Sequence, residues 1–149
     1  MIVTINTDAS FCKDTKKGGY AFSIVSNTFK TKRSGVFKTE CINPDDAEAR
    51  CIVNAMKIAM TISGATRIIV NTDSLNAIAI LTAKPNKYVS TTKFEYIRQA
   101  YLKLFQPQSM RVEFRHVKAH TGINDARSKV NEWCDQEAKK QLNKARNEK

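Results

Sequence analysis

The stretch IVTINTDAS, residues Ile2–Ser10, decides the fold because it joins a β-branched run to an acidic residue. Ile2–Ile5 is predicted to be a short strand that leads into Asn-Thr-Asp, so that Asp8 closes the strand. Aspartate is common where a strand turns, and this structural explanation stays open for Asp8 taken alone. Asp8 becomes informative because three further acidic residues follow, each predicted to lie at the end of a strand or on a helix: Glu48, Asp73 and Asp135.

Outward from this stretch, the pattern predicts an α/β protein with the element order β-β-β-α-β-α-α-β-α. Turn residues separate the first three strands, which would form an antiparallel meander. The fourth strand is continuously apolar, as is typical of a buried parallel strand. The expected strands are Ile2–Ile5, Tyr20–Ser26, Lys30–Ile42, Arg67–Asn71 and Val112–His116, and the expected helices are Asn43–Ile62, Ser74–Thr82, Thr92–Phe105 and Ala126–Lys144. Residues 144–149 are expected to fray.

The composition indicates a globular chain with a polyanionic partner. The 149 residues are most simply one domain, residues 1–149, and they carry 25 Lys and Arg for a formal net charge of +11. Such a charge favours nucleic acid, although a basic surface kept for solubility is the alternative. Cys51 and Cys134 fall among small apolar residues, which predicts reduced core thiols and a cytoplasmic location. We expect neither a membrane-spanning segment nor a secretory signal.

Helical periodicity places Glu48 toward the core of the first predicted helix. At roughly 100° per residue, Glu48 shares the apolar stripe of Ile52. A buried glutamate is costly unless it is paired or bound to a metal ion, and pairing with a buried Lys or Arg remains the alternative. The opposite face, which is expected to be solvated, carries Asp46, Arg50, Lys57 and Thr61.

Asp73 and Asp135 complete the acidic set. Asp73 directly follows the apolar strand, although it could also be a neighbour of a helix cap at Ser74. Asp135 flanks the buried stripe of the last helix and could face either way. Since parallel strands present their carboxyl ends to one edge of a sheet, we expect Asp8 and Asp73 to meet there, with Glu48 between them. Converging carboxylates suit a hard cation such as Mg²⁺, which predicts a metal-dependent nuclease.

The motifs together resemble type 1 ribonuclease H, in the right order over nearly the whole chain. They are Thr7-Asp8-Ala9-Ser10, Glu48, Asn71-Thr72-Asp73-Ser74, His116-Val117-Lys118-Ala119-His120, and Asn131-Glu132-x-x-Asp135. The resemblance implies a ribonuclease H-like fold with a five-stranded mixed sheet, in which three antiparallel strands precede two parallel ones and helices cover both faces.

The resemblance also implies hydrolysis of the RNA strand of RNA/DNA hybrids to 5′-phosphate and 3′-hydroxyl ends by a two-metal mechanism. Two Mg²⁺ ions, or Mn²⁺ as a substitute, would be held by four carboxylates. By this resemblance Asp8 bridges both ions, Glu48 and Asp73 hold the ion on the leaving-group side, and Asp135 holds the ion that carries the attacking water. His120 would assist proton movement and product release, with a surface loop residue as its alternative.

Other residues are predicted around this centre. His116 and His120 lie four apart and could suggest zinc, but this spacing aligns two rings on a helix, and His116 is predicted to end a strand. Trp133 is predicted to fill the core. The residues expected to contact nucleic acid are Ser10, Asn43, Ser74, Lys118 and Lys87.

Two further functions remain open. One is a nuclease of the same fold that acts on double-stranded RNA, single strands or branched DNA. The other is a non-catalytic nucleic-acid binding domain, against which the four acids argue, because a pure binder would gain from losing negative charge near phosphates. We expect the protein to be a monomer.

Overall fold

The structure is a computed structural model and describes residues 1–82, 91–104, 110–117 and 126–147. Its elements follow the predicted order, and five strands form one sheet in the order β3-β2-β1-β4-β5. The strands are β1 Ile2–Phe11, β2 Gly18–Val25, β3 Lys30–Val36, β4 Arg67–Thr72 and β5 Arg111–His116. The helices are α1 Pro44–Ala59, α2 Leu75–Thr82, the short 3₁₀ helix Thr91–Phe94, α3 Glu95–Lys103 and α4 Ala126–Asn147.

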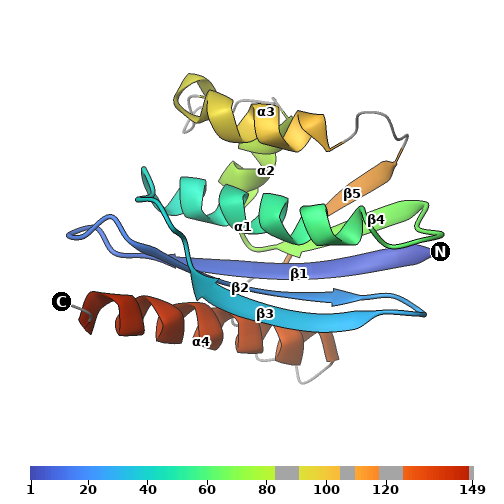
Figure 1. Cartoon of the computed structure of the whole chain (residues 1–149), viewed down its shortest axis with the longest axis horizontal. Helices are drawn as coiled ribbons and strands as arrows, with labels where there is room; N and C mark the ends of the chain where they lie inside the picture. Colours follow the sequence, from blue (N-terminus) through green and yellow to red (C-terminus); the bar gives the residue numbers. More distant parts are fainter. Residues whose placement is uncertain (83–90, 105–109, 118–125, 148–149) are drawn as a thin grey trace.

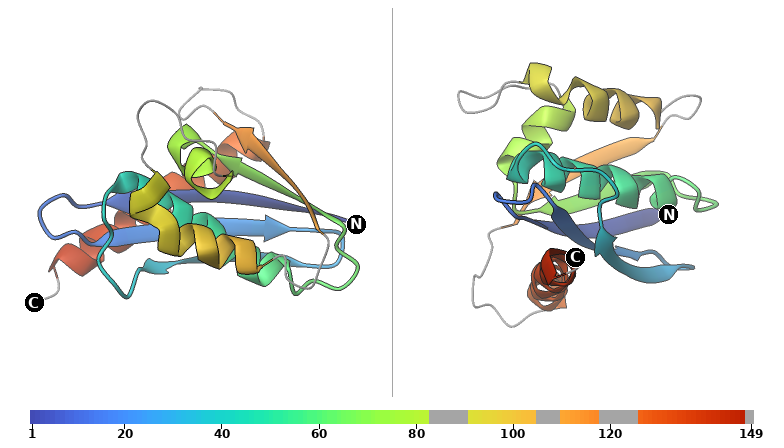
Figure 2. Two further views of the ribbon diagram at one scale, coloured as in Figure 1. Left: turned by 90° about the horizontal axis from the view of Figure 1, so that it is seen from above. Right: turned by 60° about the vertical axis from the view of Figure 1, so that its left-hand side comes forward.

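The sheet is mixed and carries helices on both faces, as expected. β1, β2 and β3 pair antiparallel, while β1 pairs parallel with β4 and β4 with β5. Figures 1 and 2 show α1, α2 and α3 above one face of the sheet and α4 alone beneath the other. The resulting three layers confirm the predicted fold class.

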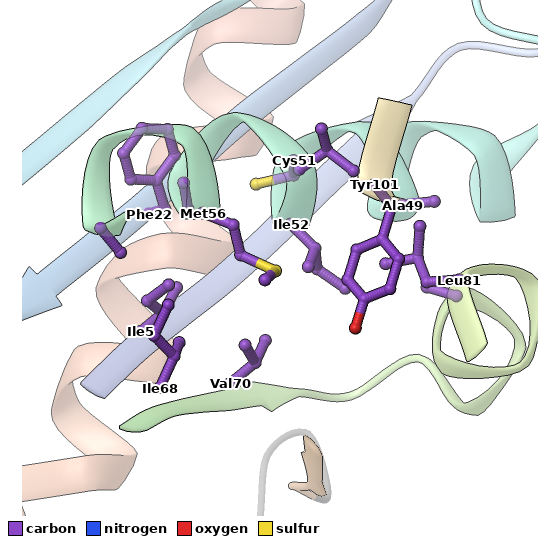
Figure 3. Packing of buried hydrophobic residues seen from close by; sticks show 14 of the residues in the cluster. Ile5, Phe22, Ala49, Cys51, Ile52, Met56, Ile68, Val70, Leu81 and Tyr101 are labelled. Atoms are coloured by element: carbon purple, nitrogen blue, oxygen red, sulfur yellow. The ribbon is translucent and has the colours of Figure 1, made fainter. Parts of the chain in front are cut away.

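The main core lies between α1 and the sheet (Figure 3). Ile5, Val70 and Ile52 are fully buried there, with α3 adding Tyr101. The buried residues alternate along the strands and recur at helical spacing along α1. These two periods place them on the surfaces of the sheet and of the helix that face each other. The core therefore fixes α1 over β1 and β2.

The opposite face packs α4 closely through small side chains. Ala21 of β2 lies in a second cluster with Cys134 and Ala138 of α4, and all three are fully buried. A Cβ atom at Gly19 would lie 2.8 Å from the backbone nitrogen of Leu142. Glycine is needed at this position because α4 passes directly over β2. Trp133, predicted to fill the core, is half-buried beside this cluster, and Lys32 Nζ lies 4.9 Å from its ring centroid.

Two predicted strand boundaries are wrong because cross-strand pairing, which the local pattern does not contain, decides them. β1 continues to Phe11, since Asp8 pairs with Ala21 and Phe11 with Gly18. Asp8 therefore lies within β1 and does not close it. β3 ends at Val36, because its partner β2 begins at Gly18 and the last pair is Gly19 with Val36.

The prediction that Asp46 lies on a solvated face is also wrong. Its side chain is fully buried, and this burial is tolerated because the Ile42 N–H, the Tyr96 hydroxyl and the Arg50 guanidinium all donate to it. Lys57, predicted for the same face, is exposed as expected.

The last helix extends further than predicted. α4 runs to Asn147, and Ala145 in its last turn is 4% exposed. Lys17 of the β1–β2 turn donates from its Nζ to the Ala145 carbonyl at 2.9 Å, which ties this end down. Among the described residues, none of the helices has the length and apolar character needed to cross a membrane.

Candidate active site

Asp8 lies where β1 outruns its parallel neighbour. The parallel pairing of β1 with β4 ends at Asn6 and Asn71, whereas the antiparallel pairing with β2 continues past Asp8. Asp8 is 7% exposed. One edge of β1 beyond Asn6 thus faces the end of β4, and this edge holds the candidate site.

Glu48 reaches this edge from α1. The Ala9 N–H donates to Asp8 Oδ1 at 2.9 Å and to Glu48 Oε1 at 3.1 Å, so both carboxylates meet one backbone donor. Glu48 is 9% exposed, as its place on the apolar stripe predicted. Its Oε2 is buried and has no hydrogen-bond partner among the described residues. In the same part of the chain no Lys or Arg forms an ion pair with Glu48, so the alternative of a buried cationic partner is not supported.

Asp73 joins these two from the end of β4. It follows Thr72, the last residue of the strand, and its side chain is exposed. One oxygen from each of Asp8, Glu48 and Asp73 lies within 4.8 Å of the others. Three carboxylates from separate elements therefore converge, which is the arrangement predicted from the ends of the parallel strands.

Asp135 approaches from α4 but is not a member of this group among the described residues. Its side chain is 22% exposed and accepts an ion pair from Lys139 at 3.1 Å. Its negative charge nevertheless contributes to a raised pKa at Asp8. The expected set of four carboxylates is thus a group of three with Asp135 nearby on the other face of the sheet.

The electrostatics of the group disfavour full ionisation without a cation. Burial, the charge of Asp73 and the charge of Asp135 raise the pKa of Asp8 from 3.8 to about 7. Burial and then the charges of Asp8 and Asp73 raise the pKa of Glu48 well above its usual value. Carboxylates that share a buried site repel one another when both are charged, unless a cation neutralises them.

The residues present fit a divalent cation. All of the converging ligand atoms are carboxylate oxygens, the donors that Mg²⁺ and Mn²⁺ prefer. The buried Oε2 of Glu48 is an acceptor that lacks a donor in the described part of the protein. A bound cation would satisfy this atom and remove the repulsion within the group.

The two core thiols lie next to this site. Cys51 Sγ of α1 is 3.3 Å from the Asp8 carbonyl oxygen, and Cys134 Sγ of α4 is 3.7 Å from the Asn6 carbonyl oxygen. Both are free and buried, as predicted. Burial raises the pKa of Cys134 to about 12 and that of Cys51 well above its usual value, so both remain neutral thiols that pack α1 and α4 onto β1.

The predicted nucleic-acid contacts fall into two groups. Within the described residues, Ser10 is half-buried on β1, while Asn43 and Ser74 cap helices. Asn43 Oδ1 accepts the Asp46 N–H at 2.9 Å, and Ser74 Oγ accepts the Ala77 N–H at 3.0 Å. His120, Lys118 and Lys87 lie outside the described residues.

One residue near the site was not predicted to belong to it. His116, the last residue of β5, places its Nε2 3.2 Å from the Asp73 carbonyl oxygen. The sequence placed His116 at the end of a strand and in the motif that ends at His120, and it gave His116 no role at the acidic site. The parallel register, in which Thr72 pairs with His116, is what brings the ring beside Asp73.

Comparison with known proteins agrees with this architecture. The chain matches the family model described as RNase H over residues 1–143. It is similar to the N-terminal RNase H domain of a Mycobacterium tuberculosis protein, solved as a fusion with maltose-binding protein, with 16% identity, a TM-score of 0.74, and coverage of 97% of this chain and 96% of that one. It is also similar to RNase H1 from the halophilic archaeon Halobacterium salinarum, with 17% identity, a TM-score of 0.71, and coverage of 97% and 99%. No curated protein sequence matches significantly.

Proposed function

Because the chain belongs to the RNase H family, we propose that it is a nuclease that hydrolyses the RNA strand of RNA/DNA hybrids to 5′-phosphate and 3′-hydroxyl ends. The observation that carries the proposal is the convergence of Asp8, Glu48 and Asp73 within 4.8 Å. These acids gather in a chain whose formal net charge is +11. A basic protein that concentrates negative charge at one point is suited to hold cations against a polyanionic substrate.

The proposed cofactors are two Mg²⁺ ions, with Mn²⁺ as a substitute. Asp8 would contribute to both ions, Glu48 and Asp73 to the one on the leaving-group side, and Asp135 to the one on the side of the attacking water. When bound, the cations supply neutralisation of the negative charge that phosphodiester hydrolysis builds on the attacking and leaving oxygens.

The protein prepares this site before substrate arrives. The backbone N–H of Ala9 orients Asp8 and Glu48 together, and both carboxylates are buried. The raised pKa of Asp8, about 7, makes proton release from this site part of cation binding near neutral pH. The excess of Lys and Arg attracts the phosphate backbone, and this attraction weakens as salt increases.

A cleavage assay tests the proposal directly. Labelled RNA/DNA hybrid, double-stranded RNA, single-stranded RNA, DNA duplex and branched DNA are each incubated with the full chain in Mg²⁺, in Mn²⁺ or in chelator. We expect cleavage of the RNA strand in hybrid that stops with chelator. Asp73→Asn should abolish cleavage and still bind hybrid, because the substitution removes a ligand charge and keeps the side-chain shape. Asp14→Asn, at an exposed turn residue, is the matched control and should cut normally.

Each outcome has a defined meaning. Full activity in Asp73→Asn would refute the metal assignment. Cleavage confined to double-stranded RNA, single strands or branched DNA would keep the chemistry and change the substrate. Hybrid binding without cleavage under any cation would indicate a binding domain that is not an enzyme.

The remaining assignments are proposals of the same kind. We expect His120→Ala to slow turnover without abolishing it, since water can replace in part a histidine that moves protons. A single catalytic domain spanning residues 1–149, a monomeric state and a cytoplasmic location stay predictions from the sequence.

A further inference from the structure

The carboxyl end of β4 is joined to β5 by two consecutive hydrogen bonds of different kinds. The Val117 N–H donates to the Thr72 carbonyl at 2.8 Å, as the parallel ladder requires. At the next carbonyl, that of Asp73, the His116 ring takes over with Nε2 at 3.2 Å. A side chain thus continues the ladder one residue beyond the end of β4, which is the residue whose carboxylate joins the acidic group.

The main chain after Asp73 is held as well. The Thr72 hydroxyl accepts the Ser74 N–H at 3.2 Å. Ser74 Oγ caps α2 through the Ala77 N–H at 3.0 Å, and the Ser74 carbonyl accepts the Ile78 N–H at 3.3 Å. The peptide unit that joins Asp73 to Ser74 is therefore bonded through its N–H to β4 and through its carbonyl to His116. Of these contacts, the one made by the His116 side chain comes from a different strand, β5.

The chemistry of this contact fixes the role of the ring. A carbonyl oxygen only accepts, so His116 Nε2 must carry the hydrogen. The ring is exposed and the bond lies at the rim of the sheet. Burial of the ring therefore does not account for its placement, whereas the hydrogen bond to Asp73 does.

We propose that His116 is a positioning residue that orients Asp73 for cation binding by holding the Asp73 carbonyl. This inference rests on the proposed function, because it assigns a partner to one of the proposed ligands. Residues that orient a metal ligand without touching the metal commonly change metal affinity or activity by about 10-fold to 100-fold when they are replaced.

Three substitutions separate the donor from the ring. H116F keeps a ring and removes the donor. H116Q places an amide Nε2 at the same number of bonds from Cβ as the histidine Nε2. H116N carries its donor one bond closer to the backbone and should not reach the carbonyl. A positioning role predicts that glutamine restores function while asparagine and phenylalanine do not.

Three measurements are made on the full chain. Calorimetry gives the Mn²⁺ dissociation constant without substrate, steady-state kinetics on hybrid gives kcat and KM at saturating Mg²⁺, and NMR gives the amide shift of Ser74 without metal. We expect H116F and H116N to weaken Mn²⁺ binding by about 10-fold and to lower kcat similarly, with H116Q within about threefold of wild type. KM should stay within about twofold, because a ligand orientation acts on the chemical step. The Ser74 shift should move in H116F and return toward wild type in H116Q.

The outcomes distinguish this inference from the function on which it rests. Equal Mn²⁺ affinity in wild type and H116F, with normal kcat, would overturn the positioning role and leave the proposed function intact. H116Q that is as impaired as H116F would also overturn it, because ring packing would then be responsible. A wild-type protein that binds no Mn²⁺ would overturn the proposed function, and the positioning role would fall with it.

Discussion

Asp46 and Glu48 lie on the same helix, both are buried, and their surroundings are opposite. Asp46 Oδ2 accepts the Ile42 N–H at 2.8 Å, and Oδ1 accepts the Tyr96 hydroxyl at 2.8 Å. The Arg50 guanidinium completes the site with an ion pair of 3.0 Å. Asp46 is therefore neutralised and hydrogen-bonded entirely within the protein.

Glu48 receives one backbone donor and is surrounded by other acids. Its Oε1 accepts the Ala9 N–H, while its Oε2 has no partner in the described ranges of the chain. Asp8 and Asp73 both raise its pKa. The comparison teaches that Asp46 finds its counter-charge within the chain, whereas Glu48, proposed above to hold a cation, has no cationic partner among the described residues.

The largest expected effect comes from removing the charge of Glu48. Glu48→Gln should lower hybrid cleavage by about 10³-fold, because a lost ligand removes about 4 kcal/mol of charge stabilisation from the transition state. The metal-free protein should be at least as stable as wild type, since repulsion with Asp8 disappears. Activity and thermal melting measure the two effects. Glu95→Gln, on an exposed turn of α3, is the control, and cleavage above one tenth of wild type in Glu48→Gln would contradict the assignment.

Asp46→Asn should show the reverse pattern. Removing one partner of a buried ion pair costs about 3 kcal/mol, because the Arg50 guanidinium loses its counter-charge while 13% exposed. Urea unfolding measures this loss, and cleavage well below the melting temperature should persist. A stability equal to wild type would mean that Asp46 does not hold α1 and α3 together.

The pH dependence of the stability of the metal-free protein tests the acidic group around Asp8. The pKa of Asp8 is raised to about 7, so the metal-free folded protein binds a proton more tightly than the unfolded chain does. This contribution is fully present below about pH 4 and is lost as the pH rises through about 7. We expect the free energy of unfolding to fall by about 2 kcal/mol from pH 5 to pH 8, or roughly 6 °C in Tm.

Excess Mg²⁺ should remove this decline, because it binds the ionised folded form. Asp73→Asn should make the decline smaller, since the charge of Asp73 is the largest charge that raises the pKa of Asp8. Metal-free stability that rises between pH 5 and pH 8 in wild type and equally in Asp73→Asn would show that the charge of Asp73 does not raise the pKa of Asp8.

The smallest expected effect comes from changing the shape of the Arg50 side chain beside Asp46. Arg50 also donates to the Thr39 hydroxyl at 2.9 Å and to the Glu40 carbonyl at 2.9 Å. Arg50→Lys keeps the charge beside Asp46 but loses the planar fork, so we expect a loss of about 1 kcal/mol, near 3 °C in Tm. Unchanged melting would indicate that charge alone holds this segment.

The parts of the site that follow from local pattern were predictable. The apolar run before Asp73 indicated a parallel strand, and helical periodicity turned Glu48 inward; both are properties of a few neighbouring residues. The same periodicity failed for Asp46, because the Tyr96 hydroxyl that buries it comes from a helix far along the chain. Periodicity reports which face a residue occupies and does not report what later covers that face.

The parts that depend on register or on spacing between layers were not predictable. The length of β1 depends on its pairs with β2, and the place of His116 depends on the register of β5 against β4. How far Asp135 reaches depends on how closely α4 approaches β2 over Gly19. Each of these requires two distant segments to be placed together, which no single stretch encodes.

The overrun of β1 past the end of β4 has a consequence for self-association. A strand edge without a neighbour offers a template on which another polypeptide can add itself. Here the Glu48 carboxylate accepts the Ala9 N–H on that edge. An incoming strand would therefore have to displace this carboxylate and desolvate the acidic residues beside it. The carboxylate proposed to hold a cation therefore also occupies a backbone donor that an added strand would need.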